Sequence, residues 1–491
     1  MHSNQLIEQI RLAASAQLDP LTRSALGQYM TPWAIACFMT SLFSERTPVT
    51  LLDAGAGVGS LSMAFLNRFP KSHIEAWEID PTLRGYLIDL LSDANATIHG
   101  KDFIEDATNN IQFGLGARFS HAILNPPYKK INSNSAHRAL LKELGIETVN
   151  LYTAFLALTI LLMENGGEIV AIIPRSFCNG TYYRPFRKLM LSKCAIDHIH
   201  IFESRKKAFR DDDILQENVI IKLVCNKIQG DVVISESHDG SLIDYDETVL
   251  SFNQIVKPGD SESYIHIPAV AGEEETHSPL FAHSVNEIGI DICTGPIVDF
   301  RLREYCRTEL CEGAAPLLYA HHFLDGVVRY PRAHKKPSAI LVNDKTRRWL
   351  MVSGCYVVTK RFSSKEEKKR VVASVFDAET LPCKLVGFEN HLNIFHSAKH
   401  GLDRETAYGL ATFLNSTVVD NHFRVFSGHT QVNATDLRNM RYPSRQQLRE
   451  FGRIAMIKNL SQSEIDAMIK GAEKQSGYQG DSTSRGFASH Y

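Results

Sequence analysis

Residues 49–61 read VTLLDAGAGVGSL and decide the fold. An apolar run ends in Asp53, and glycines at alternate positions then lead into a segment with helical spacing. Glycines let the backbone turn tightly and approach a bound molecule closely. The spacing is not the G-x-G-x-x-G of pyrophosphate binders. This strand–turn–helix unit therefore favours a nucleoside without phosphates, since no anion has to be held at the helix start.

Further apolar runs follow at regular intervals and end in polar residues. Residues 74–80 end in acids, residues 96–103 end in Asp102-Phe103, and residues 121–124 run into Asn125. A helix is expected at 151–163, and more apolar stretches lie at 168–174, 196–202 and 219–224. Strands alternating with helices predict an α/β fold with a Rossmann-like, doubly wound and mostly parallel sheet. In such sheets ligands bind at the carboxyl edge.

The tetrapeptide at the end of the fourth strand, Asn125-Pro126-Pro127-Tyr128, indicates the chemistry. The exocyclic amine of adenine is a poor nucleophile because its lone pair is delocalised into the ring. The Asn125 side-chain oxygen and the Pro126 carbonyl offer acceptors for its two hydrogens, and Pro127 fixes where that carbonyl points. Tyr128 offers a ring face for stacking, typically worth ~1–3 kcal/mol. Taken alone, the motif is equally a strand followed by a Pro-Pro turn.

A helix start precedes the glycine turn. In residues 28–32, QYMTP, Thr31 is placed as an N-cap and Pro32 in the first turn of a helix expected from Trp33 to Phe43. A bare helix N-terminus beside a site is able to hold a carboxylate. An ordinary capped helix is the alternative.

Taken in order, these stretches resemble the S-adenosylmethionine-dependent DNA adenine N6-methyltransferases with an N-P-P-Y motif. The second half resembles the BsuBI/PstI-type modification methylases at residues 356–372, 387–396 and 427–443. The resemblance implies S-adenosylmethionine as cofactor, double-stranded DNA as partner, a CTGCAG-like palindrome as target and a cognate restriction endonuclease as a separate protein. It implies cofactor contacts from Tyr29, Thr31 and Pro32 at the methionine end, Asp53, Ala54, Gly55 and Gly57 at the centre, Glu78 at the ribose, and Asp102 and Phe103 at the adenine. It also implies that Phe209 covers the target base opposite Tyr128, although a core residue is the alternative for Phe209.

The composition bounds the remaining possibilities. The chain has 491 residues, a net charge of −2 and nine scattered cysteines without a C-x-x-C pair. A reducing cytosol is therefore favoured over a disulfide framework or a zinc site. No apolar run is long enough to span a bilayer and the first residues do not form a signal peptide, so we expect a cytoplasmic protein. The reaction needs no metal. A nucleic-acid surface must be local, because the net charge is close to zero.

The charge changes sign along the second half. Between Glu236 and Glu275 there are ten acidic residues and one lysine, whereas between Arg329 and Arg370 there are thirteen Lys or Arg and three acidic residues. Basic residues interleaved with aromatics suit a phosphate-following surface. Later loops rich in Asn, Gln and His suit contacts with base edges, or form ordinary turns and caps. The residues expected to bind DNA are Lys335, Lys336, Arg347, Arg348, Lys360, Arg361, Asn390, His391, Arg424, His429, Gln431 and Asn433.

The expected domains are a catalytic domain with N-terminal helices at 1–235, an acidic linker at 236–280, an α+β target-recognition domain at 281–443, C-terminal helices at 444–472 and a disordered tail at 473–491. The expected function is site-specific methylation of adenine N6 in duplex DNA by a protein without a nuclease motif. Two alternatives stay open. One is a protein glutamine N5-methyltransferase, because N-P-P-Y also orients a side-chain amide. The other is a catalytically silent DNA-binding protein that keeps the fold.

Overall fold

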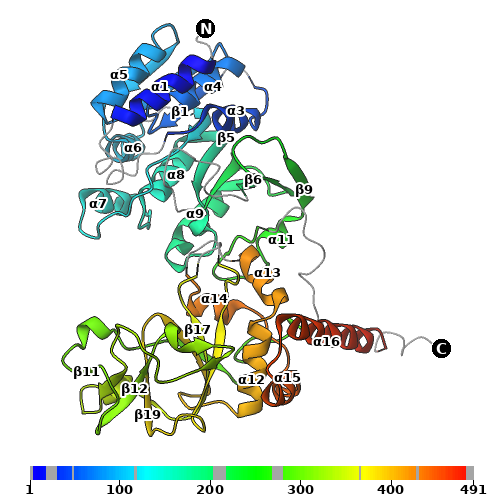
Figure 1. Cartoon of the computed structure of the whole chain (residues 1–491). Helices are drawn as coiled ribbons and strands as arrows, with labels where there is room; N and C mark the ends of the chain where they lie inside the picture. The colour runs from blue at the N-terminus through cyan, green and yellow to red at the C-terminus, as the bar shows by residue number, and fades with distance from the viewer. Residues whose placement is uncertain are drawn as a thin grey trace, which may run out of the picture. The chain divides into compact units, whose positions relative to one another are not determined.

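The computed structural model describes residues 4–17, 30–46, 49–115, 119–202, 217–267, 280–363, 367–426 and 431–482 (Figure 1). The chain forms two compact units, Met1–Gly272 and Glu273–Tyr491. The helix expected at the start of the chain is α1 (Asn4–Gln17), and the helix expected from Trp33 is α3 (Trp33–Ser41). In the described residues no helix is long and apolar enough to cross a membrane.

The first unit is built on one nine-stranded sheet with the order β3-β2-β1-β4-β5-β7-β6-β8-β9. The strands are β1 (Thr50–Ala54), β2 (His73–Trp77), β3 (Ala96–His99), β4 (Phe119–Leu124), β5 (Met163–Pro174), β6 (Cys194–Phe202), β7 (Asn218–Cys225), β8 (Val232–Ser237) and β9 (Asp246–Leu250). The pairs from β3 to β5 are parallel, and β7 lies antiparallel between β5 and β6. This confirms the doubly wound, mostly parallel sheet. The strand order reverses between β1 and β4, which is where such sheets bind ligands.

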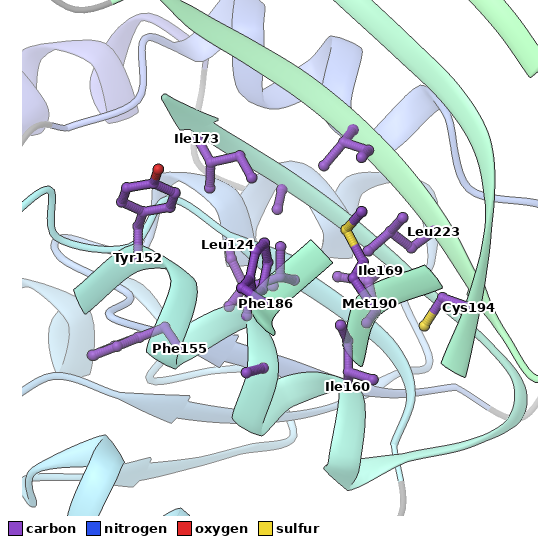
Figure 2. Close-up of a cluster of buried hydrophobic side chains, with 14 of the residues drawn as sticks. Leu124, Tyr152, Phe155, Ile160, Ile169, Ile173, Phe186, Met190, Cys194 and Leu223 are labelled. Carbon is purple, nitrogen blue, oxygen red and sulfur yellow. The ribbon is translucent and has the colours of Figure 1, made fainter. Parts of the chain in front are cut away.

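Helices cover both faces of this sheet, so its central strands are buried on both sides. The helices are α4 (Ser60–Arg68), α5 (Pro81–Leu90), α6 (Phe103–Gln112), α7 (Ala136–Glu143), α8 (Leu151–Leu162), α9 (Arg184–Lys193) and α11 (Phe252–Ile255), besides α1 and α3. Every residue of β4 is buried, as expected for a strand between two helical layers. Because side chains alternate along a strand, Leu124 joins the core beneath α8 while Ile123 joins the core on the opposite face. Figure 2 shows the core on the α8 side, to which Tyr152, Phe155, Leu124 and Ile173 all belong.

The segment expected to be an acidic linker, 236–280, belongs largely to the first unit. It completes β8 and supplies β9, which pairs antiparallel with β8 and ends the sheet. Ile255, Ile265 and Ile267 are buried in the core beneath α8. The boundary therefore falls at Gly272 rather than at residue 235. An exposed edge strand and a linker both carry charged side chains because both contact water. Composition alone therefore does not distinguish an edge strand from a linker.

The second unit contains two sheets and a group of helices, which confirms the predicted α+β class. The six-stranded sheet has the order β10-β20-β17-β18-β14-β13 and the five-stranded sheet the order β11-β15-β12-β19-β16. The strands are β10 (Asp291–Thr294), β11 (Cys306–Arg307), β12 (Ala314–Leu318), β13 (Phe323–Leu324), β14 (Val327–Val328), β15 (Ala339–Leu341), β16 (Met351–Val352), β17 (Cys355–Lys360), β18 (Ala373–Asp377), β19 (Leu385–Phe388) and β20 (Leu392–His396). The helices are α12 (Arg404–Leu414), α13 (Thr417–Phe426), α14 (Ala434–Asn439), α15 (Arg445–Ile457) and α16 (Gln462–Ser482).

Two features of these helices bear on the expected C-terminal organisation. Helices α12 and α15 pack backbone to backbone, because a Cβ on Gly409 would lie 1.7 Å from the Leu448 carbonyl oxygen and a Cβ on Gly452 1.8 Å from that of Glu405. The tail expected to be disordered from residue 473 is instead helical to Ser482, since α16 continues through it. Its Gly, Ser and Gln content favours disorder, but a helix already started by the preceding turns extends at little cost per residue.

Candidate active site

A cavity of about 360 Å³ lies at the carboxyl edge of β1, β2 and β4. It is lined by residues that are far apart in the sequence but that end neighbouring strands or begin neighbouring helices. Eight of the expected site residues line it, namely Thr31, Gly55, Gly57, Glu78, Asp102, Phe103, Asn125 and Pro127. The glycine turn and the Asn-Pro-Pro-Tyr motif therefore face one common space, of a size typical of small-molecule sites.

The glycine turn is fixed by a carboxylate from the next strand. Gly57 has φ +58° and Gly59 has φ +91°, which are conformations that favour glycine. The Gly57 N–H donates to Glu78 Oε2 at 2.8 Å, and the Asp80 N–H donates to Oε1 at 2.8 Å. Burial raises the pKa of Glu78 above its usual value, while these two bonds oppose the shift. A Cβ on Gly57 would meet nothing within 4 Å, so the turn leaves open space above it.

Asp102 and a group of aromatic side chains line another part of the cavity. Asp102 caps α6, because its Oδ1 accepts from the Glu105 N–H at 3.1 Å, and its Oδ2 lies 3.1 Å from His137 Nε2. Phe103 is buried, with ring centroids 5.0 Å from Phe155 and 5.6 Å from Trp77. An acceptor beside aromatic faces suits a purine ring with an amino group.

The Asn125 side chain is held from both sides. Its Nδ2 donates to Thr31 Oγ1 at 2.9 Å, and the Tyr128 hydroxyl donates to its Oδ1 at 2.9 Å. The same hydroxyl lies 3.1 Å from the Ile172 carbonyl oxygen. Since the amide oxygen has two lone pairs, it is able to accept from an amino group as well as from Tyr128.

The expected N-cap role of Thr31 is wrong. Pro32 occupies the N-cap position of α3 without a side-chain cap, and the Trp33 N–H donates to Glu8 Oε2 at 3.1 Å. The helix start thus holds a carboxylate of α1, and the buried Thr31 hydroxyl holds Asn125. The Thr31 hydroxyl can bond either to the start of the helix or to a residue distant in sequence. The spacing of residues in the sequence indicates only the first of these.

Two residues expected at the cofactor's centre do not line the cavity. Asp53 and Ala54 are fully buried in β1, beneath the glycine turn. Asp53 Oδ2 accepts from the Ser62 hydroxyl at 2.7 Å, and burial raises the pKa of Asp53 to about 7. Its role in the structure is therefore to support the turn from below. Pro32, Pro126 and Tyr128 adjoin the cavity-lining residues in sequence without lining the cavity themselves. Tyr29, Phe209 and His429 lie outside the described residues.

Several lining residues were missed. Trp77, Ile79 and Phe155 add apolar surface, and Ile79 keeps 58% of its surface exposed at this site. The sequence places them in an expected strand and an expected helix, and an apolar residue there does not by itself indicate a cavity wall. A second group comes from the segment after the tetrapeptide and from the start of α7 (Ala136–Glu143), where no motif marked a site. These residues are Lys129, Lys130, Ile131, Asn132, Ser135 and His137.

In the second unit, some of the expected DNA-binding residues come together. Arg361 N–H donates to the His391 carbonyl at 2.9 Å, and its guanidinium lies 3.3 Å from the Asn390 carbonyl oxygen and 3.5 Å from Gln431 Oε1. Lys336 Nζ lies 3.6 Å from Glu389 Oε1, which lies 2.8 Å from His391 Nδ1. We call Lys336, Arg361, Asn390, His391 and Gln431 the Arg361 cluster.

Other expected DNA-binding residues make contacts inside the second unit. Arg424 pairs with Asp420 at 2.7 Å on α13, and Asn433 forms a capping box with Asp436 at the start of α14. The Arg348 guanidinium lies 4.4 Å from the Trp349 ring centroid. These contacts support a structural role for Arg424, as an ion pair within a helix, and for Asn433, as a helix cap. In the described part of the chain, no group of three or more His, Cys, Asp or Glu side chains is arranged to hold a metal ion.

Comparison with known proteins gives a consistent result. The family description "Eco57I restriction-modification methylase" matches residues 40–209. The chain is 49% identical to the Type II methyltransferase M.BsuBI of Bacillus subtilis, over 95% of this chain and 97% of that protein. It is 39% identical to the Type II methyltransferase M.PstI of Providencia stuartii, over 95% and 96%. The solved DrdV–DNA complex shares the fold, with a TM-score of 0.52 and 10% identity over 92% of this chain and 59% of that chain.

Proposed function

The chain belongs to the family of Type II restriction-modification methyltransferases that includes M.BsuBI and M.PstI, and from this premise we propose that it methylates N6 of adenine at a specific site in duplex DNA. The observation that supports the amino-group target is the Asn125 amide at the cavity wall, held by Thr31 and Tyr128. An amide oxygen and a neighbouring carbonyl suit an amino group, which has two hydrogens to donate.

The residues around the cavity fit S-adenosylmethionine. Glu78 offers carboxylate oxygens whose remaining lone pairs suit ribose hydroxyls, and Asp102 with Phe103 suits an adenine ring. The open space above Gly57 leaves room for the nucleoside to approach the backbone of the glycine turn. When bound, the cofactor supplies a methyl group on a positively charged sulfur.

The protein's own part in the reaction is to bind and orient. Asn125 Oδ1 and the Pro126 carbonyl accept the two N6 hydrogens, and Tyr128 provides a face for the base. The target adenine must leave the duplex, because its N6 is otherwise paired within the stack. No covalent intermediate forms on the protein. The nitrogen that gains the methyl group is then positively charged and strongly acidic, so it releases one proton to water and no general base is required. Positioning two reactants in this way accounts for a large part of the rate of such transfers.

The second unit supplies sequence recognition in this proposal. The Arg361 cluster combines a lysine and an arginine, which suit guanine, with Asn390 and Gln431, whose amides suit adenine, and with His391. The turn that carries Asn390 and His391 is firmly held, since the Gly295 N–H donates to the Leu392 carbonyl and the Asn390 N–H to that of Ile297. A CTGCAG-like palindrome is the proposed target, and a separate restriction endonuclease the proposed partner in the cell.

Methyl transfer from radiolabelled S-adenosylmethionine tests this function, with duplex DNA and cell protein offered as acceptors. We expect label on DNA alone. Asn125→Ala and Tyr128→Ala are expected to abolish transfer while S-adenosylhomocysteine still binds with an affinity near that of the wild type. Label on glutamine in protein, or full turnover by the Asn125 variant, would contradict the proposal.

A further inference from the structure

An excursion of the chain between the tetrapeptide and α8 forms one wall of the cavity. It leaves and returns through a narrow neck, where the Ile131 N–H donates to the Val149 carbonyl and the Leu151 N–H to the Lys129 carbonyl, both at 2.8 Å. The excursion, residues 129–150, carries α7, which stands out from the rest of the first unit (Figure 1). Its Leu141 and Ile146 are buried in the core, so the excursion is a packed part of the unit.

Among the described residues, two side-chain hydrogen bonds join α7 to α6 and its N-cap residue Asp102. Gln112 Nε2 donates to Glu143 Oε2 at 2.5 Å, at the end of α7 distant from the cavity. His137 Nε2 lies 3.1 Å from Asp102 Oδ2, and both of these residues line the cavity. His137 is therefore the side chain through which the excursion reaches the acid expected to contact the cofactor's adenine.

His137 contacts Oδ2 of Asp102. The other oxygen caps α6, so together the Glu105 N–H and His137 fix the carboxylate in one orientation. Lys101, the nearest lysine in sequence, pairs with Asp106 at 3.0 Å. The side chains of His137 and Asp102 keep 29% and 24% of their surface exposed, so the pair lies at the surface of the cavity.

We propose that His137 is a positioning residue for the cofactor: it holds Asp102 and keeps the 129–150 excursion closed against the adenine end of the cavity. This proposal rests on the proposed function, because it assumes a nucleoside in the cavity. The consequence is an effect on cofactor affinity rather than on the transfer step. Asn125, Thr31 and Tyr128, which orient the target amine in the proposed function, are joined to one another by hydrogen bonds, whereas His137 contacts Asp102.

The test compares three variants of the full chain by calorimetric titration with S-adenosylhomocysteine. His137→Leu keeps the bulk and removes the donor, whereas His137→Gln keeps an N–H donor. His73→Ala is the matched control, because His73 is a half-exposed histidine with a polar partner, Asn95, at the start of β2 and away from the cavity. We expect the Leu variant to bind about fivefold to tenfold more weakly, the factor of one hydrogen bond. The Gln and His73 variants should stay within about twofold.

Steady-state kinetics separates positioning from a merely structural role. His137→Leu is expected to raise the KM for S-adenosylmethionine while kcat at saturating cofactor stays within about twofold of wild type. Unchanged affinity in the Leu variant, or equal losses in the Leu and Gln variants, would overturn the proposal. If the Leu variant shows no cooperative thermal transition, His137→Ala takes its place with the same expected loss. A wild-type protein that binds the probe but labels no DNA would refute the proposed function and leave this comparison valid.

Discussion

Replacing Thr31 by valine tests the arrangement around Asn125 most sharply. The two side chains have nearly the same shape, so the change removes one acceptor and little else. Thr31 is 4% exposed and its Oγ1 accepts from Asn125 Nδ2 at 2.9 Å. Without this bond the amide loses one of the contacts that set its orientation, while the Tyr128 hydroxyl still donates to Asn125 Oδ1. We therefore expect a fraction of molecules to present the nitrogen, a donor, where the reaction needs an acceptor.

The size of the effect follows from the kind of bond. A neutral hydrogen bond contributes about 1 kcal/mol net, and up to about 3 kcal/mol when a buried group loses its partner. Since about 1.4 kcal/mol corresponds to a factor of ten in rate, Thr31→Val should slow methyl transfer by about fivefold to 100-fold. Thr31→Ser, which keeps the hydroxyl, is the control and should stay within about threefold of wild type.

The assay is single-turnover transfer to a duplex that contains the recognition site, with enzyme and cofactor in excess. Cofactor affinity is measured in parallel with S-adenosylhomocysteine, because Thr31 also lines the cavity. Equal transfer rates for the Val and Ser variants would refute the role of this hydrogen bond. A loss confined to cofactor affinity would assign Thr31 to the cofactor alone.

Two further changes test the burial of polar side chains in the sheet of the first unit. The Asp53 carboxyl titrates near 3.8 when unfolded and at about 7 when folded, so the folded state holds one more proton between these values. The free energy of unfolding should therefore fall by a few kcal/mol as the pH rises from about 4 to about 7, and then level off. Asp53→Asn should remove most of this pH dependence, measured by thermal melts at several pH values. An unchanged pH dependence in the variant would contradict the burial argument. Asn218, 5% exposed, has no hydrogen-bond partner for either amide atom among the described residues, so Asn218→Leu should raise the free energy of unfolding by about 1–2 kcal/mol, and a lower melting temperature would show that the amide is satisfied in solution.

Much of the catalytic half could be predicted because its signals are local. A glycine turn after a buried strand, an acid at the end of the next strand and the Asn-Pro-Pro-Tyr motif each mark one strand end. A parallel sheet places such ends at one edge. Gly57, Glu78, Asp102 and Asn125 therefore meet at the cavity as expected.

What could not be predicted depends on contacts between distant segments. Thr31 followed by Pro32 has the pattern of a helix cap, and only the folded chain shows that Asn125, 94 residues away, takes the hydroxyl. His137 lies in the first turn of α7, and its approach to Asp102 depends on how the 129–150 excursion folds back, which the local sequence does not show. The acidic residues of β9 have the composition of a linker, because an edge strand and a linker are both exposed to water.

Mapping modified bases in the DNA of cells that express the protein tests the central claim most directly. We expect N6-methyladenine at one short palindrome, with CTGCAG as the first sequence to examine, and none in cells that express Asn125→Ala at the same level. Methylated cytosine at the mapped site, or unmodified DNA despite abundant folded protein that binds S-adenosylhomocysteine, would contradict the account.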